Sequence, residues 1–583
     1  MSQRKLKKIR QEIKKVEENI VEYEQSFSLR TKIKEIWKSN WLYLIGITLL
    51  VIVIYFNGMW GGFVSDDYAS ITANPYINDF WKMFSYGNSM SFSTYLVSKL
   101  FGITSSVPYH ILNLIIFILV CITLFVLMEI IFDNVWLTRL SVLLFAVHPI
   151  HVEAVSWISG RVYLLVSWYV LLSLICIIGY TRTRKNKYLW LAFFTFFLAF
   201  STDRPRPFSL ILLIMVYVLT MGIKNIRINW KKTSIVGLVL MSLFLIIAWQ
   251  NIIYRINVVN SGYNASESVF YNPFFQYPTG ISKYLQLLYF PIDLTLYHTM
   301  YIFPVWLNWM ILLTYLTAIV YFYFKNKRYF FALSFILAAI LPSIAPVKVS
   351  WLVAERYMFL GSFGFCMFMA LLIIDISRKY KLLMPIITGL IVVFFGVRTV
   401  FRNVDWQTNH NLWVNTCQVS PNSHNAWNNI GDDYDKLATA AKTDIEKKYQ
   451  FDNAIKGFTQ STVIKPNYAD AYHNRANIFF KIGRLDLARD SYNTALYYSP
   501  SLYQTYLSLT QIDLMESNLQ LAYEHASKAL QLDPTNPQAA YVLAIVYAQA
   551  GNKEQAITIL KEILKQTPSF TMAKQALLQL EPQ

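Results

Sequence analysis

Between Trp41 and Val400 the sequence is a series of apolar runs, each close to the length of a membrane-spanning helix. A helix needs roughly 20 apolar residues to cross a bilayer. Because helices satisfy their own backbone hydrogen bonds inside lipid, such a chain is expected to fold as a helical bundle in a membrane. Eleven runs are predicted to be spans: 41–57, 108–132, 137–150, 162–180, 188–202, 206–222, 234–252, 303–324, 329–345, 356–375 and 382–400.

The composition agrees with a membrane protein that carries a soluble part. Apolar residues make up 55% of the 583 residues and charged residues 15%, against roughly 25% charged in a typical soluble protein. So many apolar residues exclude a disordered chain, and four Cys exclude a disulfide-rich secreted scaffold. The net charge of +18 is compatible with nucleic-acid binding. However, no basic stripe is interleaved with aromatic residues, so no nucleic-acid partner is predicted.

The distribution of Lys and Arg predicts the orientation of the chain. Cytoplasmic loops of membrane proteins are enriched in both residues. With eleven spans, the basic loops all fall on one side, which predicts a cytoplasmic N-terminus and an extracytoplasmic C-terminus. These loops contain Arg182, Arg184, Lys185, Lys187, Lys224, Arg227, Lys231, Lys232, Lys325, Lys327, Arg328, Arg378, Lys379 and Lys381. The protein is expected to be an integral membrane protein, of the plasma membrane if its source is prokaryotic.

The regions outside the predicted spans differ in character. Residues 1–40 contain eleven Lys/Arg and six Glu, and predict a cytoplasmic amphipathic helix rather than a cleavable signal peptide. Residues 58–107 and 253–302 are the two large outer loops of the membrane domain, 41–400. The apolar stretch Ile281–Phe290 is too short to span, so it predicts a re-entrant or interfacial helix. A sequon at Asn264 lies in the same outer loop.

The C-terminal third is an internal repeat. Pro466, Pro500, Pro534 and Pro568 recur every 34 residues, and so do Ala454, Ala488, Ala522 and Ala556. This is the tetratricopeptide (TPR) period, in which Ala stands where two helices cross closely and Pro ends the second helix. After a connector, 401–420, residues 421–583 are therefore predicted to form about four TPR repeats and a capping helix, 569–581.

The first repeat is longer than the others, and the array has an expected partner. The segment from Trp427 to Tyr434 fits the pattern W-x2-L-G-x2-Y with Ile for Leu. From Trp427 to Ala454 there are eleven residues more than the standard spacing, so an insertion is predicted within 436–450. TPR arrays form a concave surface for polypeptide segments, and a protein or peptide acceptor is the expected partner. A purely structural cap is the alternative.

Two adjacent carboxylates, Asp66 and Asp67, follow the first predicted span. Like charges at this distance raise one pKa, which suits a general base. The pair also suits a divalent cation, the one cofactor to which these residues point. A turn or helix-capping role is the alternative reading of the same dipeptide.

The second candidate cluster begins at His148 and ends at Arg161. His148, His151 and Glu153 have offsets that suit zinc, but Pro149 interrupts a helix through both His residues. Arg161 can clamp a phosphate with two parallel hydrogen bonds.

Two further clusters lie at predicted outer ends of spans. Arg204 and Arg206 break the trend of basic residues on the cytoplasmic side, which predicts an anionic partner such as a lipid phosphate. Glu355 and Arg356 precede the tenth predicted span, and an internal pair between them is the alternative to a functional role. Together the four clusters supply carboxylates and arginines for transfer from a lipid-phosphate donor outside the membrane.

With these residues in place, the chain resembles the transmembrane and tetratricopeptide-repeat-containing protein O-mannosyltransferases, which have the GT-C glycosyltransferase fold. The resemblance covers nearly the whole chain after residue 40. One position departs from the family pattern, because Asp203-Arg204-Pro205 stands where the family often has Ser-Lys-Glu or Ser-Lys-Pro. The matching stretches are DDYASITANPYI (66–77), HPIHVEAVSWISGR (148–161), KYLQLLYFPIDLTLYH (283–298), VAERYMFLGSFGFC (353–366) and RNVDWQTNHNLW (402–413).

The resemblance implies an all-α, GT-C-like membrane bundle followed by a TPR solenoid. It also implies a polyprenyl-phosphate sugar donor, typically of mannose, and a Ser/Thr hydroxyl of a protein as acceptor. The acidic pair of the family carries over to Asp66 and Asp67, and the arginine of its Gly-Arg pair carries over to Arg161 at the donor phosphate. Its late Glu-Arg carries over to Glu355 and Arg356. The alternatives are a non-enzymatic membrane-anchored TPR scaffold and a transporter or metal-handling protein that uses His148 and His151.

Overall fold

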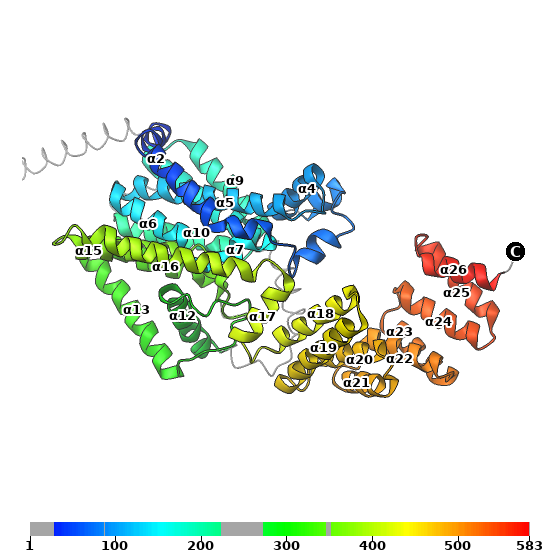
Figure 1. Cartoon of the computed structure of the whole chain (residues 1–583). Helices are drawn as coiled ribbons and strands as arrows, with labels where there is room; N and C mark the ends of the chain where they lie inside the picture. Colours follow the sequence, from blue (N-terminus) through cyan, green and yellow to red (C-terminus); the bar gives the residue numbers. More distant parts are fainter. Residues whose placement is uncertain (1–27, 87, 223–271, 345–350, 582–583) are drawn as a thin grey trace, which may run out of the picture. The chain divides into compact units, whose positions relative to one another are not determined.

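The computed structural model describes residues 28–86, 88–222, 272–344 and 351–581. The predicted span 234–252, the sequon at Asn264, and most of the predicted N-terminal helix lie outside the described residues. Within them every regular element is a helix (Figure 1). The chain forms two compact units, Met1–Asn415 and Thr416–Gln583, which we describe separately.

The first unit contains the helices from α2 to α16, and α17 crosses the boundary to the second unit. In chain order they are α2 (Leu29–Tyr55), η1 (Phe56–Trp60), η2 (Tyr68–Thr72), α3 (Phe80–Ser85), α4 (Ser89–Phe101), α5 (Val107–Phe132), α6 (Val135–Val147), η3 (Pro149–His151), α7 (Val152–Ser156), η4 (Ile158–Gly160), α8 (Arg161–Thr183), α9 (Asn186–Thr202), η5 (Arg206–Phe208), α10 (Ser209–Met221), α12 (Pro273–Tyr289), α13 (Val305–Lys325), α14 (Lys327–Ile340), η8 (Leu341–Ser343), η9 (Glu355–Met358), α15 (Ser362–Ser377), α16 (Leu383–Asp405) and α17 (Asn409–Val419).

Several of these helices are suited to cross a membrane. Five are long and apolar enough by themselves: Leu29–Trp60, Val107–Phe132, Ile158–Thr183, Val305–Lys325 and Leu383–Asp405. A sixth candidate is Val135–Val147 with Pro149–Ser156, which bends by 54° at His148. The bend has a direct cause, because Pro149 cannot donate the next helical hydrogen bond. The protein is thus an integral membrane protein with a helical membrane domain, but the number of eleven spans is not confirmed.

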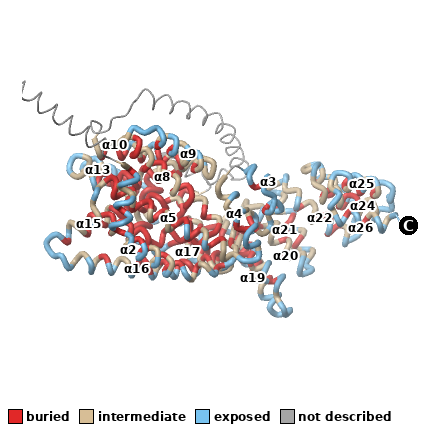
Figure 2. The backbone as a smooth tube through the Cα atoms, turned by 90° about the horizontal axis from the view of Figure 1, so that it is seen from above, coloured by how far each residue is buried: buried red, intermediate tan, exposed pale blue. Residues whose placement is uncertain are grey.

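The burial pattern separates the core of this unit from its surface. Helix α5 is largely buried and packs against α2, α6 and α8 (Figure 2). Helices α13 and α16 are also apolar enough to span a membrane, yet few of their side chains are buried, and many large apolar ones are exposed. Exposed apolar surface of this extent marks a membrane-facing side. The stretch Ile281–Phe290 lies almost wholly on α12, and its re-entrant or interfacial placement stays a prediction.

The second unit confirms the predicted repeat array. It comprises four helix pairs and a final short helix: α18 (His424–Ala440) with α19 (Asp444–Ile464), α20 (Ala469–Lys481) with α21 (Leu485–Tyr498), α22 (Tyr503–Met515) with α23 (Leu519–Leu532), α24 (Pro537–Gln549) with α25 (Lys553–Gln566), and α26 (Thr571–Leu580). The periodic alanines Ala454, Ala488, Ala522 and Ala556 are fully buried, as the close crossing of two helices requires.

The extra length of the first repeat lies in its helices. Helix α18 has 17 residues and α19 has 21, whereas the next pair, α20 and α21, has 13 and 14. The first pair is therefore longer by four and seven residues, which accounts for the eleven extra residues. The predicted insertion extends the two helices past their crossing point and adds no separate loop.

The glycine of the first repeat motif permits this crossing. A Cβ on Gly431 would lie 2.8 Å from the ring of Phe458 on α19. We therefore expect Gly431→Ala to lower the free energy of unfolding of Thr416–Gln583 by about 1–3 kcal/mol, the usual cost of overpacking a core. Urea unfolding followed by circular dichroism measures this difference. Lys456→Ala, an exposed change on α19, is the control. Equal stability of the two variants would contradict the tight crossing.

Candidate functional site

The loop that carries Asp66 and Asp67 has a strained backbone. Ser65 has φ of 53°, a left-handed conformation that non-glycine residues seldom adopt. Its amide donates to the side chain of Asn409 on α17 over 2.9 Å, and this bond helps to hold the conformation. The next turn, η2, is a π-helix. Strained backbone of this kind persists where surrounding contacts enforce it and is common at functional sites.

The two carboxylates of this loop face different environments. Asp67 is fully buried, and its Oδ1 accepts hydrogen bonds from the amide and the hydroxyl of Ser159 at 2.8 and 2.5 Å. Its Oδ2 accepts from the amide of Val64 at 3.1 Å. Asp66 is exposed, and its carboxylate forms no hydrogen bond or ion pair with the residues that the structure describes, although its backbone carbonyl accepts from the amide and hydroxyl of Ser70. Asp67 therefore fixes the loop to η4, and Asp66 is left accessible.

The pKa of Asp67 is raised to about 6, and the physical cause is burial. The hydrogen bonds from Ser159 and Val64, and the charge of Arg161, oppose this shift. Like-charge repulsion within the dipeptide, the cause considered from the sequence, is not the source. A buried carboxylate kept ionised at neutral pH costs stability, which is typical of a group retained for function.

This raised pKa predicts how stability depends on pH. The folded state binds the Asp67 proton more tightly than the unfolded state, whose pKa is near 3.8. The contribution of Asp67 to stability is therefore greatest below pH 4 and falls as the pH rises to about 6, by roughly 3 kcal/mol. Asp67→Asn should lose this dependence. Thermal unfolding of the detergent-purified wild type and variant between pH 4.5 and 7.5 measures it, and equal slopes would contradict the assignment.

Arg161 is a fully buried junction rather than an open anion site. Its guanidinium donates to the side chains of Asn113 (2.7 Å), Ser93 and Thr94 (3.2 Å each), and to the carbonyl of Tyr109 (3.2 Å). These contacts connect α4, α5 and the start of α8. Four donated bonds to neutral protein groups leave little of this side chain for a phosphate, although its charge acts on Asp67.

The two histidines of the second cluster do not form a metal centre. Nε2 of His148 contacts the carbonyl of Leu288 at 3.1 Å, and Nε2 of His151 contacts the hydroxyl of Ser362 at 2.7 Å. Aromatic rings surround both imidazoles, for example Phe145 at 4.3 Å from His151. No group of three His, Cys, Asp or Glu residues suited to a metal occurs in the part of the chain that the structure describes.

The acidic pair is only partly occupied by hydrogen bonds. Oδ1 of Asp67 accepts two bonds from Ser159 and Oδ2 accepts one from Val64, which uses three of the four lone pairs of this carboxylate. The carboxylate of Asp66 lies on the exposed side of the loop. A divalent cation at this pair stays a prediction.

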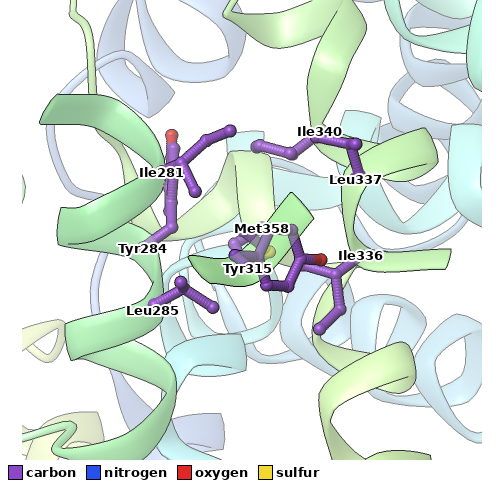
Figure 3. Close-up of a pocket in the computed structure, with 8 residues that line it drawn as sticks. All are labelled: Ile281, Tyr284, Leu285, Tyr315, Ile336, Leu337, Ile340 and Met358. Atoms are coloured by element: carbon purple, nitrogen blue, oxygen red, sulfur yellow. The ribbon is translucent and has the colours of Figure 1, made fainter. Parts of the chain in front are cut away.

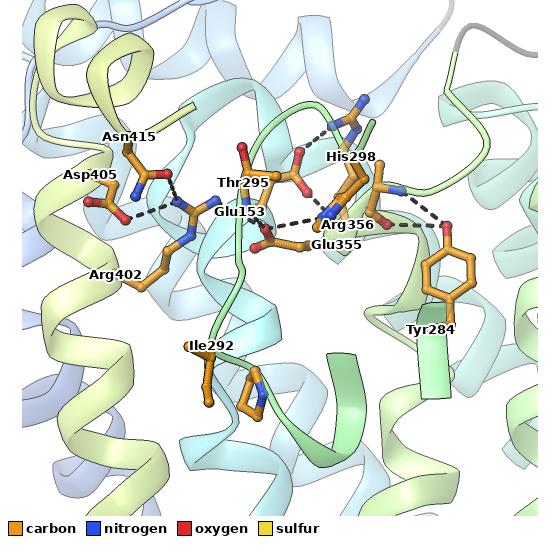
Figure 4. A network of polar contacts seen from close by, with 12 residues as sticks. Glu153, Tyr284, Ile292, Thr295, His298, Glu355, Arg356, Arg402, Asp405 and Asn415 are labelled. Carbon is orange, nitrogen blue, oxygen red and sulfur yellow. Dashed lines mark hydrogen bonds and ion pairs between the residues drawn. The ribbon is translucent and has the colours of Figure 1, made fainter. Parts of the chain in front are cut away.

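Glu153, Glu355 and Arg356 belong to one buried network (Figure 4). Glu355 and Arg356 do not pair with each other, contrary to the alternative considered from the sequence. Arg356 forms an ion pair with Glu153, whose carboxylate also accepts from the Arg356 amide. Glu355 instead pairs with Arg402 on α16 over 3.1 Å. The two residues are consecutive in the 3-10 helix η9, where successive side chains point about 120° apart, so they reach different partners.

The network includes residues that sequence reasoning missed. Glu355 accepts from the amide of Thr295 at 2.5 Å, and the ring of His298 lies 3.6 Å from the same carboxylate oxygen. Burial lowers the pKa of His298 to about 3, so the imidazole is neutral and this contact is not an ion pair. Arg402 also binds Asp405 at 2.9 Å. Thr295 and His298 lie at the end of the stretch 283–298. That stretch is the part of the sequence that could have indicated these two residues.

Arg204 and its neighbour Arg206 have different surroundings. Arg204 is exposed. Arg206 is mostly buried, with its guanidinium 4.5 Å from the ring centres of both Tyr163 and Tyr357 and 2.6 Å from the carboxylate of Asp203. Arg206 thus joins the aromatic groups around Arg356. Nothing in the sequence near position 206 indicates these ring partners, which are far away along the chain.

An apolar pocket is lined in part by Met358, the last residue of η9 (Figure 3). The hydroxyl groups of its two tyrosines contact the backbone at Ala354 and Leu333. Among the described residues, no Asp, Glu, His, Lys or Arg lines this pocket. Its lining residues are Ile281, Tyr284, Leu285, Tyr315, Ile336, Leu337, Ile340 and Met358.

The chain is similar to known proteins in its repeats and over most of its length. Family models of the tetratricopeptide repeat match residues 469–502 and 513–580. Protein O-mannosyl-transferase TMTC3 of Homo sapiens is 25% identical over 88% of this chain and 67% of its own length. Protein O-mannosyl-transferase F38B6.6 of Caenorhabditis elegans is 26% identical over 72% of this chain and 62% of its own length. The crystal structure of MamA is 16% identical, with a TM-score of 0.24, over 29% of this chain and 92% of MamA.

The similarity to the curated relatives includes the membrane domain as well as the repeats. This chain spans about two thirds of the length of those relatives. It shares with them a similarity that no TPR array alone explains, because 88% of the chain is aligned. With its apolar helices and its repeats, the chain is similar over most of its length to proteins named as protein O-mannosyl-transferases.

Proposed function

We propose that this chain is a membrane glycosyltransferase that moves a sugar, mannose in the first instance, from a polyprenyl-phosphate donor to Ser/Thr hydroxyls of a protein. The curated relatives are named as protein O-mannosyl-transferases. The observation that carries the proposal is the pair of unequal carboxylates, in which buried Asp67 fixes a strained loop and exposed Asp66 remains accessible.

Asp66 acts as the general base in this reaction. Its carboxylate accepts the proton of the acceptor hydroxyl as that oxygen attacks the anomeric carbon of the donor sugar. The bond between that carbon and the phosphate oxygen breaks, and polyprenyl phosphate leaves with the electron pair. Attack opposite the leaving group inverts the anomeric centre. A positioned base of this kind contributes about 10²–10⁴-fold to a rate.

The leaving phosphate requires positive charge. Arg161 and Arg204 are the two arginines proposed to bind the donor phosphate. Of these, Arg204 is exposed and is therefore better placed to contact a phosphate. Arg161 acts through its buried charge near Asp67, while Ser159, two residues earlier, holds the acidic loop. A supporting role falls to the buried groups that pair or hydrogen-bond with neighbouring elements, namely Glu153, Glu355, Arg356, His148 and His151.

The remaining proposals concern orientation and acceptor. The acidic loop and the TPR array face the extracytoplasmic side, where the array holds the acceptor polypeptide. The inner helices of the first two repeats carry amide side chains suited to a peptide backbone, and Asn474 donates to Asn428 over 3.1 Å. Amides of this kind bind an extended chain through its backbone and tolerate varied side chains.

Reconstitution tests the proposed reaction. The purified full-length protein in vesicles is incubated with radiolabelled mannosyl-phosphopolyprenol and an unfolded Ser/Thr-rich protein. Transfer of label to protein, released by β-elimination, is the expected result. Label that stays in the lipid with every hexose donor tested would contradict a lipid-linked glycosyltransferase and favour the scaffold alternative.

A further inference from the structure

Helices α3 and α4, in the connection between the first two spans, carry an exposed aromatic face. Trp81 is 74% exposed and Leu100 is 73% exposed. Phe80 contacts the rings of Trp81, Phe84, Phe92 and Tyr95 at centroid distances of 5.1 to 6.4 Å. These rings form one continuous apolar surface, which is unfavourable in water.

The opposite face of α4 is firmly attached to the rest of the unit. Thr94, Val97 and Ser98 are buried, and Ser98 donates to the carbonyl of Ile77 at 3.3 Å. Val97 packs in a core cluster with Ile71, Ile77, Tyr109 and Ile158. Because this face already packs against the core, a rotation of α4 that buried the aromatic face would expose the core-packing face instead. Something outside the described chain has to cover it.

The position of the two helices identifies what covers them. They lie between the end of the span Leu29–Trp60 and the start of the span Val107–Phe132. Both ends of this connection therefore reach the same membrane surface, whichever way the protein is oriented. Trp and Phe are the residues that settle at the boundary between head groups and acyl chains.

The charges of the two helices favour the same occupant. Within α3 and α4 the ionisable side chains are Lys82 and Lys99, apart from tyrosine, and neither helix contains a carboxylate. Lysines at the edge of an apolar helix face extend toward lipid phosphates while their stems stay in the apolar layer. A helix pair with apolar rings and two cations matches a phospholipid surface better than an acidic or basic protein surface.

From these observations we propose that α3 and α4 form a membrane-interface arm, in which the aromatic face inserts among the lipids and Arg161 ties the arm to the acidic loop. Arg161 donates to Ser93 and Thr94 of α4, and Ser159, two residues before it, binds Asp67. The arm thereby sets the depth of the Asp66 loop relative to the bilayer. This proposal does not depend on which group the protein transfers.

Cysteine labelling tests the insertion directly. Trp81→Cys and Leu100→Cys are labelled with an environment-sensitive NBD probe in the full-length protein, which is then reconstituted into phosphatidylcholine vesicles. The unlabelled background is low, because the native cysteines are buried or half-buried. Tyr497→Cys is the matched control, since Tyr497 is also an exposed aromatic residue, at 79%, but belongs to the repeat unit.

The expected result is blue-shifted emission at positions 81 and 100, with quenching by doxyl-labelled lipid at least several-fold stronger than at position 497. Two variants guard against misfolding at either position. Water-like emission without lipid quenching at both positions would overturn the proposal. Quenching that vanishes as the protein-to-lipid ratio rises would also overturn it, because a second copy of the chain would then be covering the face.

Discussion

Asp66→Asn is expected to lower the rate of sugar transfer by about 10²–10⁴-fold without changing the stability of the protein. The carboxylate of Asp66 is exposed and forms no hydrogen bond or ion pair with residues in the described ranges, so removal of its charge costs no contact. An amide of the same shape cannot accept the hydroxyl proton. Transfer of label from the lipid donor in vesicles, at equal amounts of folded protein, measures the loss.

The matched control is Asp133→Asn, which removes another exposed carboxylate of the membrane unit. Asp133 follows α5 and pairs with Lys32, and both lie outside the candidate site. The control should transfer at the wild-type rate. If Asp66→Asn also keeps that rate while Asp67→Asn abolishes it with a normal fold, the assignment of the base to Asp66 is wrong. The buried carboxylate would then be the base.

Breaking the buried pair between Glu153 and Arg356 is expected to cost about 3–5 kcal/mol of stability. Glu153→Gln leaves a buried guanidinium without its counter-charge, and weakens the acceptor for the Arg356 amide. Both side chains are at least nine-tenths buried, so water cannot replace the lost partner. The midpoint of thermal inactivation in detergent, followed by size-exclusion chromatography, measures the effect.

The double variant separates the pair from the individual side chains. Glu153→Gln combined with Arg356→Met removes both charges, and should be more stable than Glu153→Gln alone because no charge stays buried and unpaired. Arg378→Gln is the surface control. Arg378 pairs with Asp375 but is 76% exposed, so its loss should cost at most about 1 kcal/mol. Equal effects of the buried and surface changes would contradict the network.

Much of the fold could be predicted from the sequence because its signals are periodic. A spacing of 34 residues identified Ala454, Ala488, Ala522 and Ala556, and all four are buried at helix crossings. Apolar runs identified the membrane domain for the same reason, since each span is a local property of the chain. The number of eleven spans is not confirmed, because some apolar runs form helices of fewer than 18 residues, such as Ser362–Ser377, whose length alone does not identify a span.

The site was less predictable because its contacts join distant parts of the chain. The sequence places Asp66 beside Asp67 but does not show that Ser159 binds one of them. It places Glu355 beside Arg356, yet each pairs with a residue from another helix. Which residues pair depends on how the helices pack, and this cannot be predicted from the spacing of neighbouring residues.

Intact-mass analysis of surface proteins tests the central claim most directly. Proteins exposed outside the membrane are compared in cells with the wild-type chain, without it, and with Asp66→Asn. The account predicts hexose-sized mass additions on Ser/Thr sites that are present in the wild type and absent from the other two cells. Identical additions in all three cells, with the variant protein folded and abundant, would contradict a glycosyltransferase that uses Asp66.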